Sequence, residues 1–152
     1  MTVDRSEHWL WRLGADAWLR AAQVELAAAA ANLESRRTAV THARRAAGMA
    51  LNAVLVASHD AGVETGTEAD TELRWGRSYL DHLRALADPR VPISPLPDDL
   101  RPLAAGLLQI AVMGGGGSLV QLGRSAHGPA QHAVELARQL CDRCTAAIAT
   151  RR

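Results

Sequence analysis

The stretch "RRTAVTHARRAAGMALNAVLVAS", residues 36–58, carries the clearest structural signal in this sequence. When it is projected on an α-helix at about 100° per residue, its apolar and small side chains gather on one side. That side holds Val40, Ala43, Ala47, Ala50, Leu51 and Val54, and the opposite side holds Arg37, Thr41, Arg44, Arg45, Gly48 and Asn52. The pattern predicts one long amphipathic helix from about Arg37 to Ser58.

Helical patterns continue on both sides of this stretch, whereas runs of alternating β-branched or aromatic residues do not occur. Four further helices are expected, over about residues 4–33, 70–87, 98–113 and 129–150. Their limits come from a capping box at Asp4-x-x-Glu7, four prolines within 88–99, the glycines at 114–117, and Pro129 in a first turn. The sequence therefore predicts a single all-α domain over residues 1–152, an up-and-down antiparallel bundle of four to five helices.

The composition limits the classes of function. The 152 residues carry a net charge of +1, so no global field favours nucleic acids or acidic membranes. All 17 basic residues are arginines, which excludes any site that needs a lysine. The N-terminus lacks the long apolar run of a signal peptide or a membrane span, so we expect a soluble, cytoplasmic protein with no membrane partner. Cys141 and Cys144 are compatible with a reducing compartment.

Residues 18–29, WLRAAQVELAAA, and residues 42–55, HARRAAGMALNAVL, place small and apolar residues in a distinctive order. The two segments resemble the first and second helices of the HEPN family of bacterial helical domains, and the segment Ala133–Arg138 is similar to its last helix. The resemblance implies an antiparallel bundle that often forms homodimers. Members of that family are ribonucleases, partners of a minimal nucleotidyltransferase, or inactive modules that bind nucleotides or RNA or act as scaffolds.

Arg37 and His42 have the R-x4-H spacing that small metal-independent ribonucleases use. In ribonucleases of the resembled family the pair lies late in the chain, but here two residues separate Arg124 from His127 and seven separate it from His132. On a helix, Arg37 and His42 would point about 140° apart, too far to share one phosphate. We therefore expect no catalytic site, and keep Arg37 and His42 as catalytic candidates for an alternative hypothesis only.

The polar side of the helix predicted over 37–58 is where a ligand is expected. The resembled family carries glutamine, glutamate and lysine there, whereas this chain carries Arg44, Arg45 and Asn52. Together with Arg37 these are candidate ligand-binding residues for an anion, a nucleotide or an RNA phosphate. The other interpretation is a solvated face whose arginine stems lie along the helix surface.

No metal and no cofactor are expected. Cys141 and Cys144 lie three residues apart, but His132 lies nine residues before Cys141 and is about 13 Å away along a helix, which is incompatible with a zinc site on one helix. Gly114–Gly117 lacks the G-K-[ST] and the preceding strand of a phosphate-binding loop. We interpret it as a flexible connector, with a functional loop as the alternative.

The sequence as a whole predicts a catalytically inactive, HEPN-like binding module. We expect a homodimer that binds a nucleotide, RNA or a nucleotidyltransferase-type protein. One alternative is a metal-independent ribonuclease of the toxin type. The other is an unrelated structural helical bundle, in which an alanine-rich composition accounts for the resemblance.

Overall fold

A computed structural model describes residues 9–60, 78–93, 96–112 and 128–150 of the chain. Every regular element in this part of the chain is a helix. The elements are the 3-10 helix η1 (Trp9–Arg12) and the α-helices α1 (Ala15–Ala31), α2 (Arg36–Asp60), α4 (Tyr79–Ala87), α5 (Leu100–Gln109) and α6 (Gly128–Ala149).

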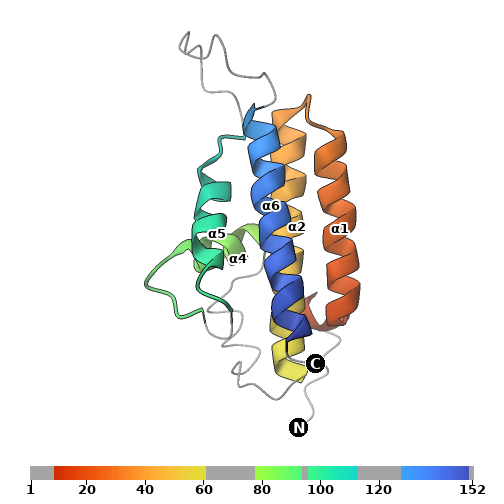
Figure 1. Ribbon diagram of the computed structural model, residues 1–152, viewed down its shortest axis with the longest axis vertical. Coiled ribbons are helices and arrows are strands. Elements are labelled where there is room, and N and C mark those ends of the chain that lie inside the picture. Colours follow the sequence, from red (N-terminus) through yellow and green to blue (C-terminus); the bar gives the residue numbers. More distant parts are fainter. Residues whose placement is uncertain (1–8, 61–77, 94–95, 113–127, 151–152) are drawn as a thin grey trace.

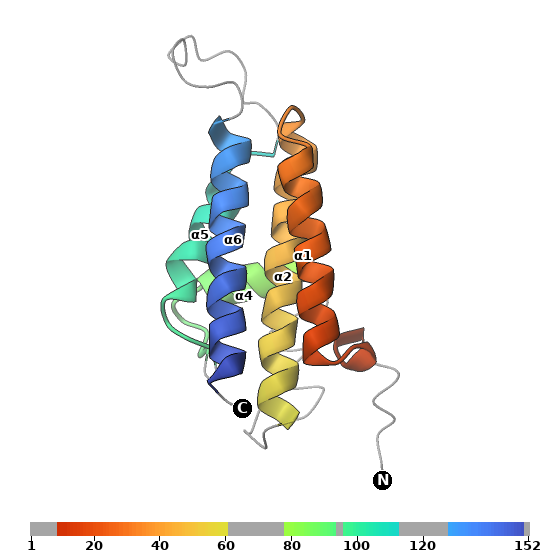
Figure 2. The ribbon, with the colours of Figure 1, turned by 45° about the vertical axis from the view of Figure 1, so that its right-hand side comes forward.

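The four longer helices alternate in direction along the chain (Figures 1 and 2). α1 runs up in the view of Figure 1, α2 runs down, α5 runs up and α6 runs down, while the short α4 lies across the bundle. α2 packs against α1 on one side and against α6 on another, and α4 and α5 pack against each other and against α2. The predicted all-α, up-and-down antiparallel bundle is confirmed.

α2 is the central helix, and its buried side chains are mostly small. The apolar side predicted for it is confirmed, because all six residues are fully buried: Val40, Ala43, Ala47, Ala50, Leu51 and Val54. Ala39, Ala46 and Ala53 extend the buried surface around the helix. Alanine side chains let neighbouring helices approach closely, so α2 can be covered on several sides at once.

The opposite side of α2 is not a solvated face along its whole length. Arg37 and Arg45 are exposed, but Gly48 and Asn52 are buried. α4 covers this side, and the side chain of Tyr79 lies directly on Gly48. A Cβ atom at position 48 would lie 2.5 Å from Cβ of Tyr79 and 3.0 Å from its Cα. The absence of a side chain at Gly48 therefore permits the contact between α2 and α4.

The first helix begins later than predicted. α1 starts after Gly14, whose backbone is extended (φ −72°, ψ 168°), and η1 precedes it as a separate turn. The indole Nε1 of Trp18 donates a hydrogen bond of 2.9 Å to the carbonyl of Leu10, which folds η1 back against α1. The chain therefore forms two separate helices, η1 and α1, where the periodicity predicted one continuous helix. The predicted capping box at Asp4 and Glu7 lies outside the described residues.

The other predicted helix ends agree with the structure in part. α2 agrees with the prediction to within two residues, and α6 starts with Pro129 in its first turn. α5 ends at Gln109, because Ile110 is extended (φ −71°, ψ 119°), so the predicted continuation toward Met113 is wrong for residues 110–112. The connection after α4 is non-helical at its described residues, and Arg101 holds it through hydrogen bonds to three carbonyls: those of Leu86, Asp88 and Val91.

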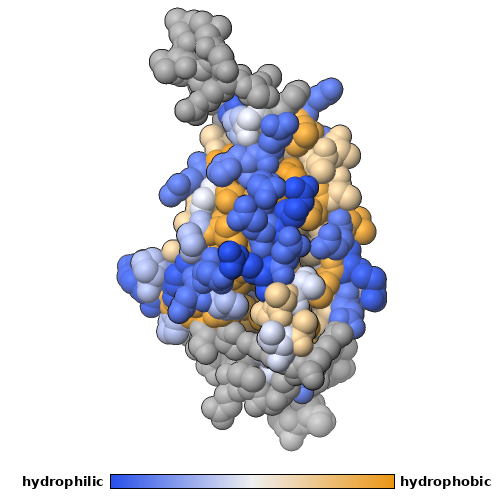
Figure 3. Space-filling view, in the orientation of Figure 1, coloured by the Kyte–Doolittle hydropathy of each residue, from blue (hydrophilic) through white to orange (hydrophobic). Residues whose placement is uncertain are grey.

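α6 is amphipathic across its full length. Its buried side holds Ala133, Val134, Ala137, Leu140, Cys141, Cys144 and Ile148, and its outer side carries charged and amide side chains. Figure 3 shows this outer side as a polar band down the middle of the visible face. In the part of the chain that the structure describes, none of the helices combines the length and apolar character needed to cross a bilayer.

The contact at Gly48 leads to a stability prediction. Gly48→Ala should destabilise the protein by about 1–3 kcal/mol, because the new methyl group would displace the backbone of α4. Gly106→Ala is the matched control, since its Cβ would meet only the end of the Leu136 side chain at 3.1 Å. Alanine should stabilise α5 there by up to about 1 kcal/mol through helix propensity. Denaturant unfolding followed by circular dichroism measures both, and equal effects would contradict the close contact.

Candidate functional site

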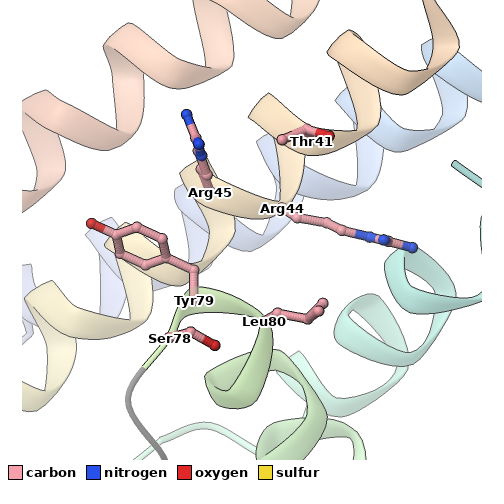
Figure 4. A pocket seen from close by; sticks show the side chains of 6 residues that line it. All are labelled: Thr41, Arg44, Arg45, Ser78, Tyr79 and Leu80. Atoms are coloured by element: carbon pink, nitrogen blue, oxygen red, sulfur yellow. The ribbon is translucent and has the colours of Figure 1, made fainter.

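A pocket lies where the first turn of α4 meets the middle of α2 (Figure 4). Its volume is about 280 Å³. It is lined by three residues of α2 and three at the start of α4: Thr41, Arg44, Arg45, Ser78, Tyr79 and Leu80. Two of the four candidate ligand-binding residues, Arg44 and Arg45, therefore line one pocket.

Local interactions fix the start of α4 at this pocket. Ser78 is the N-cap residue in an extended conformation (φ −134°, ψ 161°), and its hydroxyl accepts a hydrogen bond of 3.1 Å from the backbone N–H of Asp81. Serine at this position stabilises the first turn of a helix. Tyr79 follows Ser78 directly, and its Cβ rests on Gly48 of α2. The position of Tyr79 is therefore fixed both by the capped first turn of α4 and by the contact with α2.

Arg44 has a structural role. Its guanidinium donates hydrogen bonds to the carbonyls of Leu107, Leu108 and Ile110, at distances between 2.9 and 3.4 Å. These are carbonyls at the C-terminal end of α5, where a cation is favoured and where backbone acceptors lack helical partners. Burial, and to a smaller extent the nearby charge of Arg84, lower the pKa of Arg44. Nε and Nη2 of Arg44 are therefore committed to α5 and not to a ligand.

Of the two arginines that line the pocket, Arg45 is the one whose guanidinium is available to a ligand. Figure 4 shows its side chain leaving α2 toward α1, whereas the side chain of Arg44 points to α5. Arg45 is exposed, and within the described ranges no carboxylate forms an ion pair with it. An anion at the rim of the pocket could therefore be bound by Arg45 without breaking an existing contact.

Tyr79 forms a fixed wall between the pocket and α1. Its ring meets the ring of Trp18 edge to face, with centroids 6.4 Å apart and an interplanar angle of 80°. Burial raises the pKa of the phenol, the charge of Glu25 raises it further, and the charge of Arg45 opposes this shift. The phenol is thus within electrostatic reach of both Glu25 and Arg45, although the latter two residues belong to different helices.

Glu25 and His42 form a pair that joins α1 to α2. Oε2 of Glu25 contacts Nδ1 of His42, and the two side chains are 19% and 27% exposed, respectively. The candidate catalytic pair Arg37 and His42 is not assembled here, because the imidazole is held by a carboxylate of α1 and Arg37 is exposed with no ion pair among the described residues. Glu25 was not among the residues singled out from the sequence.

Asn52 is fully buried, and neither polar atom of its carboxamide has a hydrogen-bond partner among the described residues. A buried amide without partners costs about 1–3 kcal/mol relative to a bonded one. Because the side chain has no accessible surface, it does not belong to the pocket formed by Arg45 and Tyr79. Of the four ligand-binding candidates, the structure therefore keeps Arg45 at an open site and places Asn52 in the interior.

The two cysteines are free thiols in the core. Burial raises the pKa of Cys141 to about 12 and raises the pKa of Cys144 well above its ordinary value. Such thiols are poor nucleophiles and poor metal ligands at neutral pH. Within the described residues, no three histidine, cysteine or acidic side chains come together in a way that could hold a metal ion. His127 and Gly114–Gly117 lie outside the described residues.

Comparisons with known proteins leave the family open. No family model, no curated protein and no solved structure matches this chain. The similarity of residues 18–29 and 42–55 to HEPN domains therefore stays a prediction from the sequence.

The role of Arg44 can be tested by stability. Arg44→Lys should destabilise the protein by about 1.5–3 kcal/mol, because an ammonium group keeps the charge but lacks the planar fork that reaches three carbonyls. Arg20→Lys, at an exposed position of α1, should change the free energy of unfolding by less than about 0.5 kcal/mol. Urea unfolding measures both variants. Equal stabilities of Arg44→Lys and the wild type would show that the hydrogen bonds to α5 are not needed.

Tyr79 is the one tyrosine of the chain, so its titration can be read directly from phenolate absorbance. Its pKa should lie above the ordinary value of about 10. Glu25→Gln should lower this pKa because a negative charge is removed, and Arg45→Ala should raise it because a positive charge is removed. Arg20→Ala is the control and should leave the titration unchanged. Shifts of the opposite sign would contradict the placement of Tyr79 between Glu25 and Arg45.

Proposed function

We propose that this chain is a non-catalytic binding module whose ligand carries a phosphate group. The observation that carries the proposal is the pocket between α2 and α4, with an exposed Arg45 that forms no ion pair with any described residue. Guanidinium groups bind phosphate through paired, charge-assisted hydrogen bonds. A nucleotide or an RNA phosphate is the ligand class of this proposal.

The contacts around His42 support a binding role over the ribonuclease alternative. A proton-transfer site needs the catalytic groups to converge on one substrate atom. His42 instead contacts Glu25 on α1, and Arg37 lies one turn away on the exposed part of α2. A ribonuclease that uses Arg37 and His42 would require both side chains to turn toward a common phosphate.

The protein partners in this proposal have a separate basis. A homodimer and a nucleotidyltransferase-type partner are supported by the resemblance of residues 18–29 and 42–55 to HEPN helices. The binding role of Arg45 does not need that resemblance, because it rests on the pocket itself. An unrelated helical bundle with the same pocket would bind the same ligand class.

Binding to Arg45 can be measured with a labelled ten-nucleotide RNA and with ATP in EDTA. We expect wild-type binding to weaken as salt increases, with a slope of about one phosphate per site. Arg45→Ala should weaken binding about tenfold, which corresponds to about 1.4 kcal/mol. Arg20→Ala, which removes an exposed arginine from α1, should bind like the wild type.

Two outcomes would contradict this proposal. The first is equal binding by Arg45→Ala and the wild type. The second is cleavage of the RNA in EDTA that disappears in His42→Ala, because such cleavage would show a metal-independent ribonuclease.

A further inference from the structure

We infer that the pocket takes a small ligand in which one anionic group is joined to one flat, apolar group. This inference rests on the proposed function, because it adds a second part to the ligand that Arg45 binds. It separates a small amphiphilic anion from inorganic phosphate and from a nucleic-acid polymer.

The walls of the pocket are largely apolar. They comprise the side chains of Tyr79, Leu80, Thr41 and Arg44, together with Ser78 and Arg45. The hydroxyl of Ser78 already accepts the N–H of Asp81, and the guanidinium of Arg44 is bonded to α5. Apolar lining with few polar groups favours a ligand that buries an apolar part there.

The Tyr79 wall is formed before any ligand binds. Its ring is fixed by the edge-to-face contact with Trp18, and its Cβ is fixed against Gly48. A rigid wall lowers the entropy cost of binding, since the side chain of Tyr79 does not have to be ordered. A flat group that lies against this wall gains contact area over its whole face.

The charges around the pocket favour a single anionic group. Arg45 is exposed and has no ion pair in the part of the chain that the structure describes, whereas Arg84 pairs with Asp81 at 3.7 Å in the first turns of α4. The negative charge of Glu25 acts on the phenol of Tyr79. A chain of phosphates would bring further negative charges toward Asp81 and Glu25, which Arg45 alone cannot offset.

The size of the pocket also favours a small ligand over a polymer. Its volume of about 280 Å³ is slightly below the usual range of about 300–1,000 Å³ for small-molecule sites. One ring-sized group can occupy it with the anion at Arg45 on the rim. Most of a polymer would lie outside it and would gain nothing from the apolar walls.

The inference is tested with four probes: phenyl phosphate, inorganic phosphate, phenol and a ten-nucleotide oligouridylate. Binding of all four probes is followed by calorimetry, and that of phenyl phosphate and inorganic phosphate also by the absorbance titration of Tyr79, because phenol and uracil ionise in the same pH range as tyrosine. Phenyl phosphate should bind at least about tenfold more tightly than inorganic phosphate or phenol, because it alone uses both Arg45 and the apolar walls. Its negative charge near Arg45 should also raise the pKa of Tyr79.

Two substitutions separate the two halves of the ligand. Arg45→Ala should weaken phenyl phosphate about tenfold and leave phenol unchanged, whereas Leu80→Ala should reduce the advantage of phenyl phosphate over inorganic phosphate. Arg20→Ala and Leu13→Ala are the controls, because both replace exposed side chains of the same types at other positions. Both controls should bind all probes like the wild type.

The outcomes distinguish this inference from the proposed function. If inorganic phosphate binds as tightly as phenyl phosphate and needs Arg45, the inference is overturned and the phosphate-binding role stands. Oligouridylate binding tenfold more tightly than phenyl phosphate, with a salt slope of several phosphates, would also overturn the inference and leave the phosphate-binding role standing. If neither phosphate compound nor RNA binds, both proposals fail.

Discussion

α2 can contact four other α-helices only because most of its buried side chains are small. Ala43, Ala46, Ala47 and Ala50 are fully buried, α2 packs against its long neighbours α1 and α6, and Gly48 faces α4. Close packing gains dispersion energy from many atom pairs, which a larger side chain at any of these positions would remove by separating the helices. The arrangement of α4 and the pocket beside it are consequences of this packing constraint on one helix.

Much of the fold follows from local patterns in the sequence. The apolar repeat over 37–58 predicts α2 almost to its ends, and Pro129 marks the first turn of α6, because both signals act within one helix. The limits that could not be predicted are set by distant residues. Trp18 bonds to the carbonyl of Leu10 across eight residues, and Arg44 takes carbonyls of α5 more than sixty residues away. The apolar periodicity of a sequence does not reveal contacts between residues that are distant in the chain.

The site was only half visible in the sequence. Arg45 was singled out as a candidate because arginine stands out on the polar side of α2, but Arg44 and Asn52 look the same in a projection and have different environments. Tyr79 was missed, since its part in the site depends on how α4 crosses α2. One signal could have indicated that crossing: Gly48 is a glycine in the interior of a helix, where it lowers helix stability unless another backbone must come close.

Shape and chemistry are set by different residues at this pocket. Gly48 holds the Tyr79 wall in position from the buried side, where no bound molecule would touch it. Thr41 and Leu80 supply part of the lining, and Arg45 supplies the charge, that a bound molecule would meet. Related chains could therefore exchange one kind of ligand for another by changing these three side chains while the cavity keeps its dimensions. A change at position 48 would instead alter the dimensions and leave the chemistry of the lining intact.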